Sequence, residues 1–300
     1  MGRLPYKTRR RRALAGAVAA ALLGVLVLAP SAWAGWFLPE SGGSPNADAI
    51  RTLYILIAVL ALVIFIGVEG LLVYSLLKFR ARKGRVAAQI HGNTQLEIGW
   101  TVGAFLLLIF ITVFTFVLLP DIKNPAASDI DANGNPVAAN AQYAQTNRPG
   151  PPPGSASMNI TVTGEQYVWS YSYPGRERVL AYTDMYVPVG MTVTLDIQSK
   201  DVAHSWWIPK LGGKADAIPG YTNKSWFKIP PDTIPEGSDR VVFDGQCAEL
   251  CGRNHADMLG RVIGLRYDDW RAWYEQKARD IQIARDEAAR ERERLQDEGQ

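Results

Sequence analysis

Two long apolar segments constrain the fold of this chain more than any other feature of its sequence. They cover residues 53–77 and 98–119, and the second reads IGWTVGAFLLLIFITVFTFVLL. Each exceeds the ~20 residues that an α-helix needs to cross a bilayer. We therefore expect two transmembrane helices, joined by a short loop into a hairpin over residues 48–120.

The loop between the two segments carries the charges that orient them. It reads KFRARKGR, and its basic residues are Lys78, Arg80, Arg82, Lys83 and Arg85. Lys and Arg concentrate in the cytoplasmic loops of membrane proteins. We therefore expect this loop in the cytoplasm, and everything after Pro120 on the outer face of the cell membrane.

The first 34 residues have the pattern of an export signal. A basic cluster at residues 9–12 precedes an apolar run, which ends in Ala32-Trp33-Ala34. A small-x-small triplet in this position is typical of a signal-peptide cleavage site. We expect cleavage after Ala34, and the alternative is an uncleaved first transmembrane helix.

The rest of the chain divides into three parts by composition. Residues 121–157 are rich in Ala, Asn and Pro and are typical of a linker. Residues 158–267 hold short runs rich in Val, Ile, Thr, Tyr and Trp, separated by Gly and Pro, which favour a β-sandwich or barrel. Residues 268–300 are highly charged and predict a solvated helix with its apolar side chains near its start.

One loop of the exported part, GQCAELCGRNHADM, concentrates side chains that bind metals. It holds both cysteines of the chain, Cys247 and Cys251, together with His255 and Met258. A disulfide is one interpretation, because exported domains are oxidised, but it leaves the histidine and the methionine without a role. Structural zinc accepts Cys and His, but a thioether is not among its common ligands. Thiolate, imidazole and thioether together are the ligand set of copper electron-transfer sites.

The ligand spacing of this loop is Cys251-x3-His255-x2-Met258. This spacing resembles that of a single-copper cupredoxin, a small β-sandwich, which also needs a histidine from an earlier strand. His204 is the candidate for that histidine in the exported part. Cys247 adds a second thiolate that can bridge two metals, and the backbone carbonyl of Glu249 is placed to complete the set. We therefore expect an all-β, cupredoxin-like sandwich with a binuclear copper centre.

Four further stretches read HGNTQLEIGWT, GEQYVWSYSY, DVAHSWWIPKLGGKADAIPG and FDGQCAELCGRNHADM. Together they resemble subunit II of haem–copper cytochrome c oxidases of the bacterial type, over residues 49–267. The resemblance implies two copper ions in a CuA centre, with the ligands His204, Cys247, the Glu249 carbonyl, Cys251, His255 and Met258. It also implies a magnesium ion that the Glu249 carboxylate shares with subunit I. Asp216 matches an acidic position near that subunit contact.

The function implied by the resemblance is that of the subunit at which electrons enter a terminal oxidase. It would accept electrons from reduced cytochrome c and pass them to haem in subunit I, where dioxygen is reduced to water with proton pumping. The implied partners are subunits I and III and the membrane, with no nucleic acid. The cytochrome c donor is expected to be a separate protein, because no C-x-x-C-H for a fused haem follows Cys251.

Two carboxylates of the hairpin have interpretations of their own. Glu97 matches the glutamate at the cytoplasmic mouth of a proton path into subunit I, and the alternative is an ordinary interfacial carboxylate. Glu69 lies inside the first apolar segment, where a carboxylate is costly. We expect it to face a protein neighbour or a polar cavity, as a packing or assembly contact.

The chain departs from the family pattern where electrons enter. Tyr167 stands at the position of the tryptophan in the family's GxQWxW, and Trp169 follows it. We expect electrons to enter at these two rings. The next loop carries Arg176 and Arg178, where mitochondrial-type members present carboxylates, so we expect a less basic or membrane-anchored donor. The carboxylates that remain for docking are Asp184, Asp196 and Asp201.

Three other functions share part of this pattern. Subunit II of a quinol oxidase has the hairpin and the sandwich but lacks the copper ligands. A nitrous oxide reductase has the binuclear loop, but it is soluble and has a large second copper-binding domain. A membrane-anchored protein that stores or delivers copper would share the loop, but it has no reason to carry Glu97 or KADAIPG.

Overall fold

The computed structural model describes residues 37–298, except 82, 83, 85, 87, 132, 136–156 and 176–178. The expected signal peptide and the two arginines, Arg176 and Arg178, lie outside the described residues. The chain divides into two compact units, Met1–Glu40 and Ser41–Gln300. The second unit contains the hairpin, the sandwich and the C-terminal helix.

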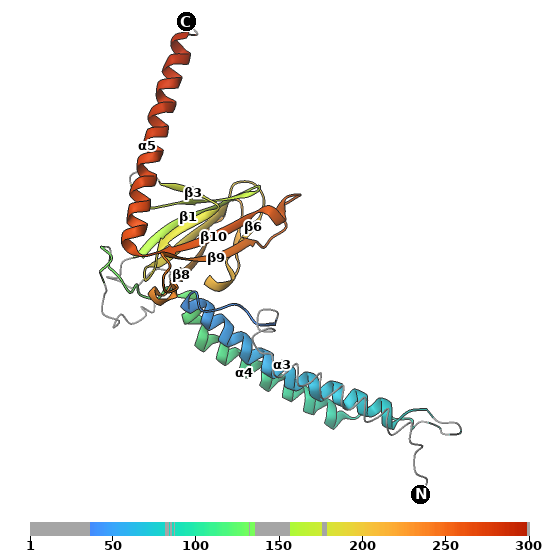
Figure 1. The fold of residues 1–300 in the computed structure, drawn as a ribbon. Helices are drawn as coiled ribbons and strands as arrows, with labels where there is room; N and C mark the ends of the chain where they lie inside the picture. The colour runs from blue at the N-terminus through green and yellow to red at the C-terminus, as the bar shows by residue number, and fades with distance from the viewer. Residues whose placement is uncertain are drawn as a thin grey trace, which may run out of the picture. The chain divides into compact units, whose positions relative to one another are not determined.

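Two long helices, α3 (Pro45–Lys78) and α4 (Thr94–Lys123), lie side by side as a hairpin (Figure 1). Proline at the first position of α3 has its φ already set for a helix. Asn93 caps α4 by accepting the N–H of Leu96. Both helices are long and apolar enough to cross a membrane, and their apolar side chains are exposed along most of their length. Apolar side chains exposed in this way are stable in contact with lipid or with a protein partner, but not in water.

The described part of the exported domain forms two five-stranded sheets. The first has the order β3-β2-β1-β5-β8, with the bounds Leu180–Tyr182, Val168–Ser172, Ser157–Glu165, Thr192–Ser199 and Asn223–Lys228. The second has the order β4-β10-β9-β6-β7, with the bounds Asp184–Pro188, Leu259–Leu265, Arg240–Cys247, His204–Trp207 and Ala215–Ala217. In each sheet one pair is parallel: β1 with β5, and β4 with β10.

The alternation of side chains along the strands explains how the sheets pack. In β1, Met158, Ile160 and Val162 are buried, and the residues between them are more exposed. Successive side chains of a strand point to opposite faces, so one face of the sheet is apolar. From the other sheet, Val262 and Phe243 join the same core. The predicted cupredoxin-like sandwich is thereby confirmed.

Polar side chains fix the outer ends of the hairpin to the first sheet. At the start of α3, Asn46 Nδ2 donates to the carbonyl of Trp226 at 2.8 Å. After α4, the Thr192 N–H donates to Ser128 Oγ at 2.8 Å, and Thr192 Oγ1 donates to the Ala126 carbonyl at 2.6 Å. The early part of the expected linker is thus anchored to the sandwich. Composition alone gave no sign of these bonds.

The charged tail forms one helix, α5 (Tyr267–Glu298). Its first turns pack on the sandwich, where Trp273 stacks on Tyr186 with ring centroids 4.5 Å apart. Trp270 Nε1 donates to the Tyr186 carbonyl, and the Tyr274 hydroxyl donates to the Pro174 carbonyl. Beyond these turns the side chains are mostly exposed, and several pair along the helix itself.

Candidate metal centre

The metal-binding side chains meet at one end of the second sheet. Strand β9 ends at Cys247 and β10 begins just after Met258, and the Cys247 N–H donates to the Met258 carbonyl at 2.9 Å. The loop between these two strands therefore folds back over the end of the sheet. The neighbouring strand β6 begins at His204, and the Ser205 carbonyl accepts the N–H of Ala248. Sheet pairing thus brings a histidine from an earlier strand to the loop.

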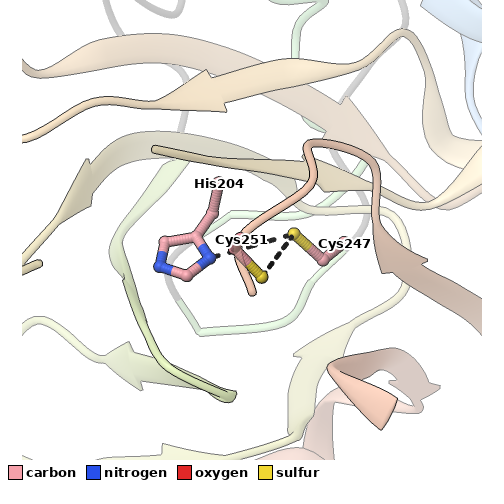
Figure 2. A group of neighbouring side chains, drawn as sticks. All are labelled: His204, Cys247 and Cys251. Atoms are coloured by element: carbon pink, nitrogen blue, oxygen red, sulfur yellow. Dashed lines mark hydrogen bonds between the residues drawn. The ribbon is translucent and has the colours of Figure 1, made fainter. Parts of the chain in front are cut away.

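The two cysteine sulfurs form the middle of the cluster (Figure 2). Cys247 Sγ lies 4.0 Å from Cys251 Sγ and 3.9 Å from His204 Nδ1. A disulfide requires sulfurs ~2.05 Å apart, and both cysteines are free thiols here. The three residues form a cluster whose ligand atoms lie within 4.8 Å of one another.

The remaining expected ligands surround this pair of sulfurs. Cys251 Sγ lies 3.6 Å from His255 Nδ1 and 3.9 Å from Met258 Sδ. Cys247 Sγ lies 3.3 Å from the Glu249 carbonyl oxygen. Two ligand atoms that bind the same ion, each at ~2.0–2.3 Å, lie roughly 3–4 Å from each other. The spacing of these atoms therefore fits metal ions held between them.

Burial makes this cluster a poor place for unpaired charge. Cys247, Cys251, Met258 and His204 are all at most 4% exposed. Burial first, and then the neighbouring Cys247, raise the pKa of the Cys251 thiol to about 11. Two adjacent thiolates would repel each other in such a site, whereas bound cations would stabilise both. The mixed sulfur and nitrogen donors suit copper.

Asp201 fixes the orientation of the His204 ring. Its Oδ1 lies 2.8 Å from His204 Nε2. Burial alone would raise the pKa of Asp201, but hydrogen bonds from Gln166, His204 and Val202 outweigh it and lower the pKa to about 2. The ionised carboxylate can only accept, so Nε2 carries the proton and Nδ1 presents its lone pair to Cys247.

The two expected electron-transfer rings take different places. Tyr167 is half-buried against the ligand loop, since a Cβ on Gly252 would lie 2.7 Å from its hydroxyl oxygen. Gly252 has φ +131°, a conformation that side chains rarely adopt, so glycine suits this close approach. Trp169 is 1% exposed, and its ring meets the edge of the His204 ring at 5.8 Å. Tyr167 is therefore the nearer of the two to an external partner.

The three carboxylates considered for docking all have partners. Asp184 pairs with Arg261 at 2.8 Å, and Asp196 pairs with Lys224 at 2.6 Å. Asp201 holds His204 as described above. The negative charge of Asp184 and Asp196 is thus partly compensated within the chain itself, whereas the neutral ring of His204 leaves that of Asp201 in place.

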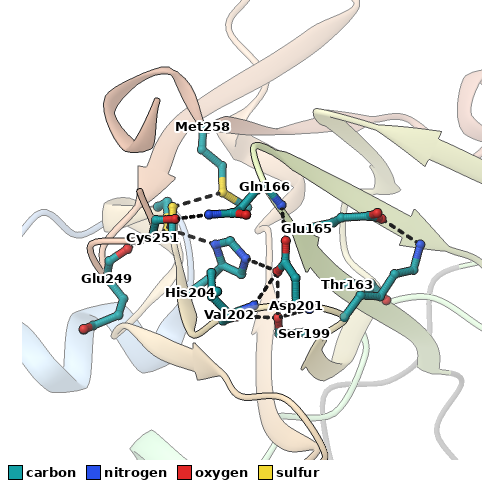
Figure 3. A network of polar contacts seen from close by, with 12 residues as sticks. Thr163, Glu165, Gln166, Ser199, Asp201, Val202, His204, Glu249, Cys251 and Met258 are labelled. Carbon is teal, nitrogen blue, oxygen red and sulfur yellow. Dashed lines mark hydrogen bonds and ion pairs between the residues drawn. The ribbon is translucent and has the colours of Figure 1, made fainter. Parts of the chain in front are cut away.

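The other expected site residues lie outside the cluster of ligand atoms. The Glu249 side chain is exposed, while its carbonyl faces Cys247. Asp216 accepts the hydroxyl of Ser205, the residue after His204. Glu97 lies in the first turn of α4, and Glu69 is exposed in the middle of α3. Sequence reasoning missed Gln166, whose amide Nε2 donates to the Cys251 carbonyl at 2.5 Å (Figure 3).

Comparisons with known proteins identify two matching family models. The model described as "Cytochrome C oxidase subunit II, transmembrane domain" matches residues 31–118. The model described as "Cytochrome C oxidase subunit II, periplasmic domain" matches residues 175–263. Together the two matches cover more than half of the chain, and they contain α3, most of α4 and all the cysteine and histidine ligands.

Individual relatives extend the similarity. Cytochrome c oxidase subunit 2 of Alkalihalophilus pseudofirmus is 33% identical over 240 residues, which cover 79% of this chain and 61% of the relative. Cytochrome c oxidase subunit 2 of Cereibacter sphaeroides is 28% identical over 284 residues, which cover 79% of this chain and 81% of the relative. The crystal structure of the periplasmic domain of subunit II of cytochrome oxidase of Bradyrhizobium japonicum is 30% identical. It matches 42% of this chain and 97% of that domain with a TM-score of 0.38. This chain thus spans less than two thirds of the first relative's length.

Proposed function

Because the chain belongs to the cytochrome c oxidase subunit II family, we propose that it is the subunit at which electrons enter a haem–copper oxidase. It accepts single electrons from reduced cytochrome c and passes them to haem in subunit I, where dioxygen is reduced and protons are pumped. Its helices span the cell membrane, and its sandwich lies on the outer face. The observation that carries the proposal is the convergence of six donor atoms, namely the two cysteine sulfurs and four atoms around them.

These six donors would hold two copper ions, and copper supplies a one-electron redox couple when bound. The two cysteine sulfurs would hold the ions together with the two histidine nitrogens. His204 lies beside Cys247, and His255 lies beside Cys251. Met258 and the Glu249 carbonyl complete the set as weaker donors.

The surroundings of the site support electron transfer with little rearrangement. His204 is fully buried and bonded to Asp201, and Met258 is fully buried just before β10. A side chain locked by packing and hydrogen bonds stays in place when the charge at the site changes. Tyr167, packed on the ligand loop, is the proposed point of contact with the donor.

Two further sites are proposed at contacts with other subunits. The exposed Glu249 carboxylate would reach a magnesium ion shared with subunit I, since carboxylates are ligands that magnesium accepts. Glu97, in the first turn of α4, would open a proton path into subunit I from the cytoplasmic side. Subunit III is a further expected member of the complex.

Purification of the full chain from its native membrane, followed by stopped-flow mixing with reduced cytochrome c, tests this function. We expect haem-containing subunits to co-purify, and the copper absorption to bleach before the haem becomes reduced. A chain that carries copper but purifies without haem subunits would be a copper carrier, and the proposal would be wrong.

A further inference from the structure

The expected copper ligands come from two separate parts of the chain. His204 begins strand β6, and the other ligands lie in or beside the β9–β10 loop. All the ligands can bind the same ions only if these two parts are held at the right distance from each other. A residue that contacts both parts could therefore fix the geometry of the whole site.

Gln166 is such a residue, and it lies in the turn between β1 and β2 (Figure 3). Its side-chain Nε2 donates to the carbonyl oxygen of Cys251 at 2.5 Å. Its backbone N–H donates to Asp201 Oδ2 at 2.7 Å, and Asp201 Oδ1 lies 2.8 Å from His204 Nε2. One residue thus connects a cysteine of the ligand loop to the carboxylate that orients the distant histidine.

The contact with the loop is close as well as polar. A Cβ on Gly252 would lie 2.9 Å from Gln166 Nε2, so the loop leaves no room for a side chain there. Cys251 itself is 4% exposed, although the bond to its carbonyl is only partly buried. Removal of the Gln166 amide would leave the partly buried Cys251 carbonyl without this hydrogen-bond donor.

We propose that Gln166 is a positioning residue of the copper centre, which ties the Cys251 end of the ligand loop to the Asp201–His204 pair. Its backbone N–H holds the histidine side, and its amide holds the cysteine side. The inference rests on the proposed function, because it requires copper at this site. It assigns the amide of Gln166 a task distinct from that of the neighbouring Tyr167, which would contact the donor.

Loss of an outer hydrogen-bond partner typically costs a metal site ~10–100-fold in affinity. For Gln166 the expected loss is in copper retention, since the amide touches a ligand residue and not the metal. The loop should also sample more positions, which would broaden the copper hyperfine lines in the electron paramagnetic resonance spectrum.

The test uses the full chain, purified in detergent and loaded with copper. Gln166→Ala removes the amide, and Gln166→Met keeps the length of the side chain but removes the donor. Gln198→Ala is the matched control, because Gln198 Nε2 donates to Thr163 Oγ1, so that this bond joins β5 to β1 and involves no copper ligand. The measurements are the rate of copper loss to an excess of chelator and the hyperfine pattern, with thermal unfolding of the copper-free proteins alongside.

We expect both Gln166 variants to lose copper roughly tenfold faster or more, with broadened hyperfine lines. The control should stay within about twofold of the parent protein, and the copper-free unfolding curves should coincide. Variants that match the control would overturn the inference, as would a defect in Gln166→Ala that Gln166→Met repairs, because packing would then hold the loop. A parent protein that takes up no copper would instead overturn the proposed function.

Discussion

Tyr167 and Gly252 show how single residues set the surface above the ligand loop. The tyrosine hydroxyl lies 2.7 Å from the position that a Cβ of Gly252 would take, so ring and loop are in direct contact. The ring is half-buried, which leaves part of it for a partner. It packs beside the ligand residues and donates no atom to the cluster of sulfurs and nitrogens.

Tyr167→Ala should therefore slow electron transfer and leave the copper spectrum intact. Loss of an aromatic anchor costs a protein interface ~2 kcal/mol or more, which is more than a tenfold loss of affinity. Stopped-flow reduction by cytochrome c measures the rate, and Tyr182→Ala removes another exposed tyrosine as a control. Unchanged kinetics in Tyr167→Ala would move the point of electron input elsewhere.

Only some residues of the metal centre could be predicted from the sequence. Most of the expected ligands lie within one loop, so their types and spacing were readable directly. Asp201 was considered only among the carboxylates that remain for docking, so its bond to His204 was not predicted, and Gln166 was not singled out at all. Their contacts depend on how the β1–β2 turn meets a loop 85 residues away, which spacing along the chain does not encode.

The first turns of helix α5 pack on the sandwich, and its later turns are exposed. Trp270, Trp273 and Tyr274 in its first turns pack against Tyr173 and Tyr186 of the sandwich. The later turns expose nearly every side chain. The sequence predicted this division, because the aromatic residues are confined to the start of the tail.

Deletions should separate the two parts of α5. Removal of residues 280–300 should change the free energy of unfolding by less than ~1 kcal/mol, since exposed helix pairs contribute only ~0.3–0.5 kcal/mol each. Removal of residues 268–300 should cost more, on the order of 2 kcal/mol or above, because it also exposes the surface covered by three partly buried aromatic rings, and fully burying one large apolar side chain contributes ~1.5–3 kcal/mol. Thermal unfolding followed by tryptophan fluorescence would compare them, and equal stability of both truncated chains would contradict this division.

The hairpin formed by α3 and α4 has a defined orientation in this account. The loop between the helices is basic, so a cysteine introduced at Gly84 should be shielded from an impermeant thiol reagent added outside intact cells. It should become labelled once the cells are opened. A second cysteine at Gly237, in the exported sandwich, is the accessible control. Labelling at position 84 in intact cells would show that the loop lies outside the cell and that the expected topology is wrong.

At the scale of the whole molecule, charge governs the encounter with the donor. Long-range attraction mainly sets the association rate and is screened over ~8–10 Å at physiological salt. The carboxylates Asp184 and Asp196 are already paired with Arg261 and Lys224. Little uncompensated negative charge is thus left at these two positions.

We therefore expect slow reduction by a highly basic, mitochondrial-type cytochrome c, with a shallow dependence on salt. A donor with a less basic face should react faster. Stopped-flow measurements with both donors across a salt series provide the comparison. Faster reduction by the basic donor, falling steeply as salt increases, would mean that an acidic docking surface exists elsewhere on the molecule.

Metal analysis of the purified full chain, together with its electron paramagnetic resonance spectrum, shows whether this chain carries a binuclear copper centre. We expect two copper ions per chain and a signal from one unpaired electron shared equally by both. One zinc ion and no copper per chain would contradict it, and so would a spectrum of a single isolated copper.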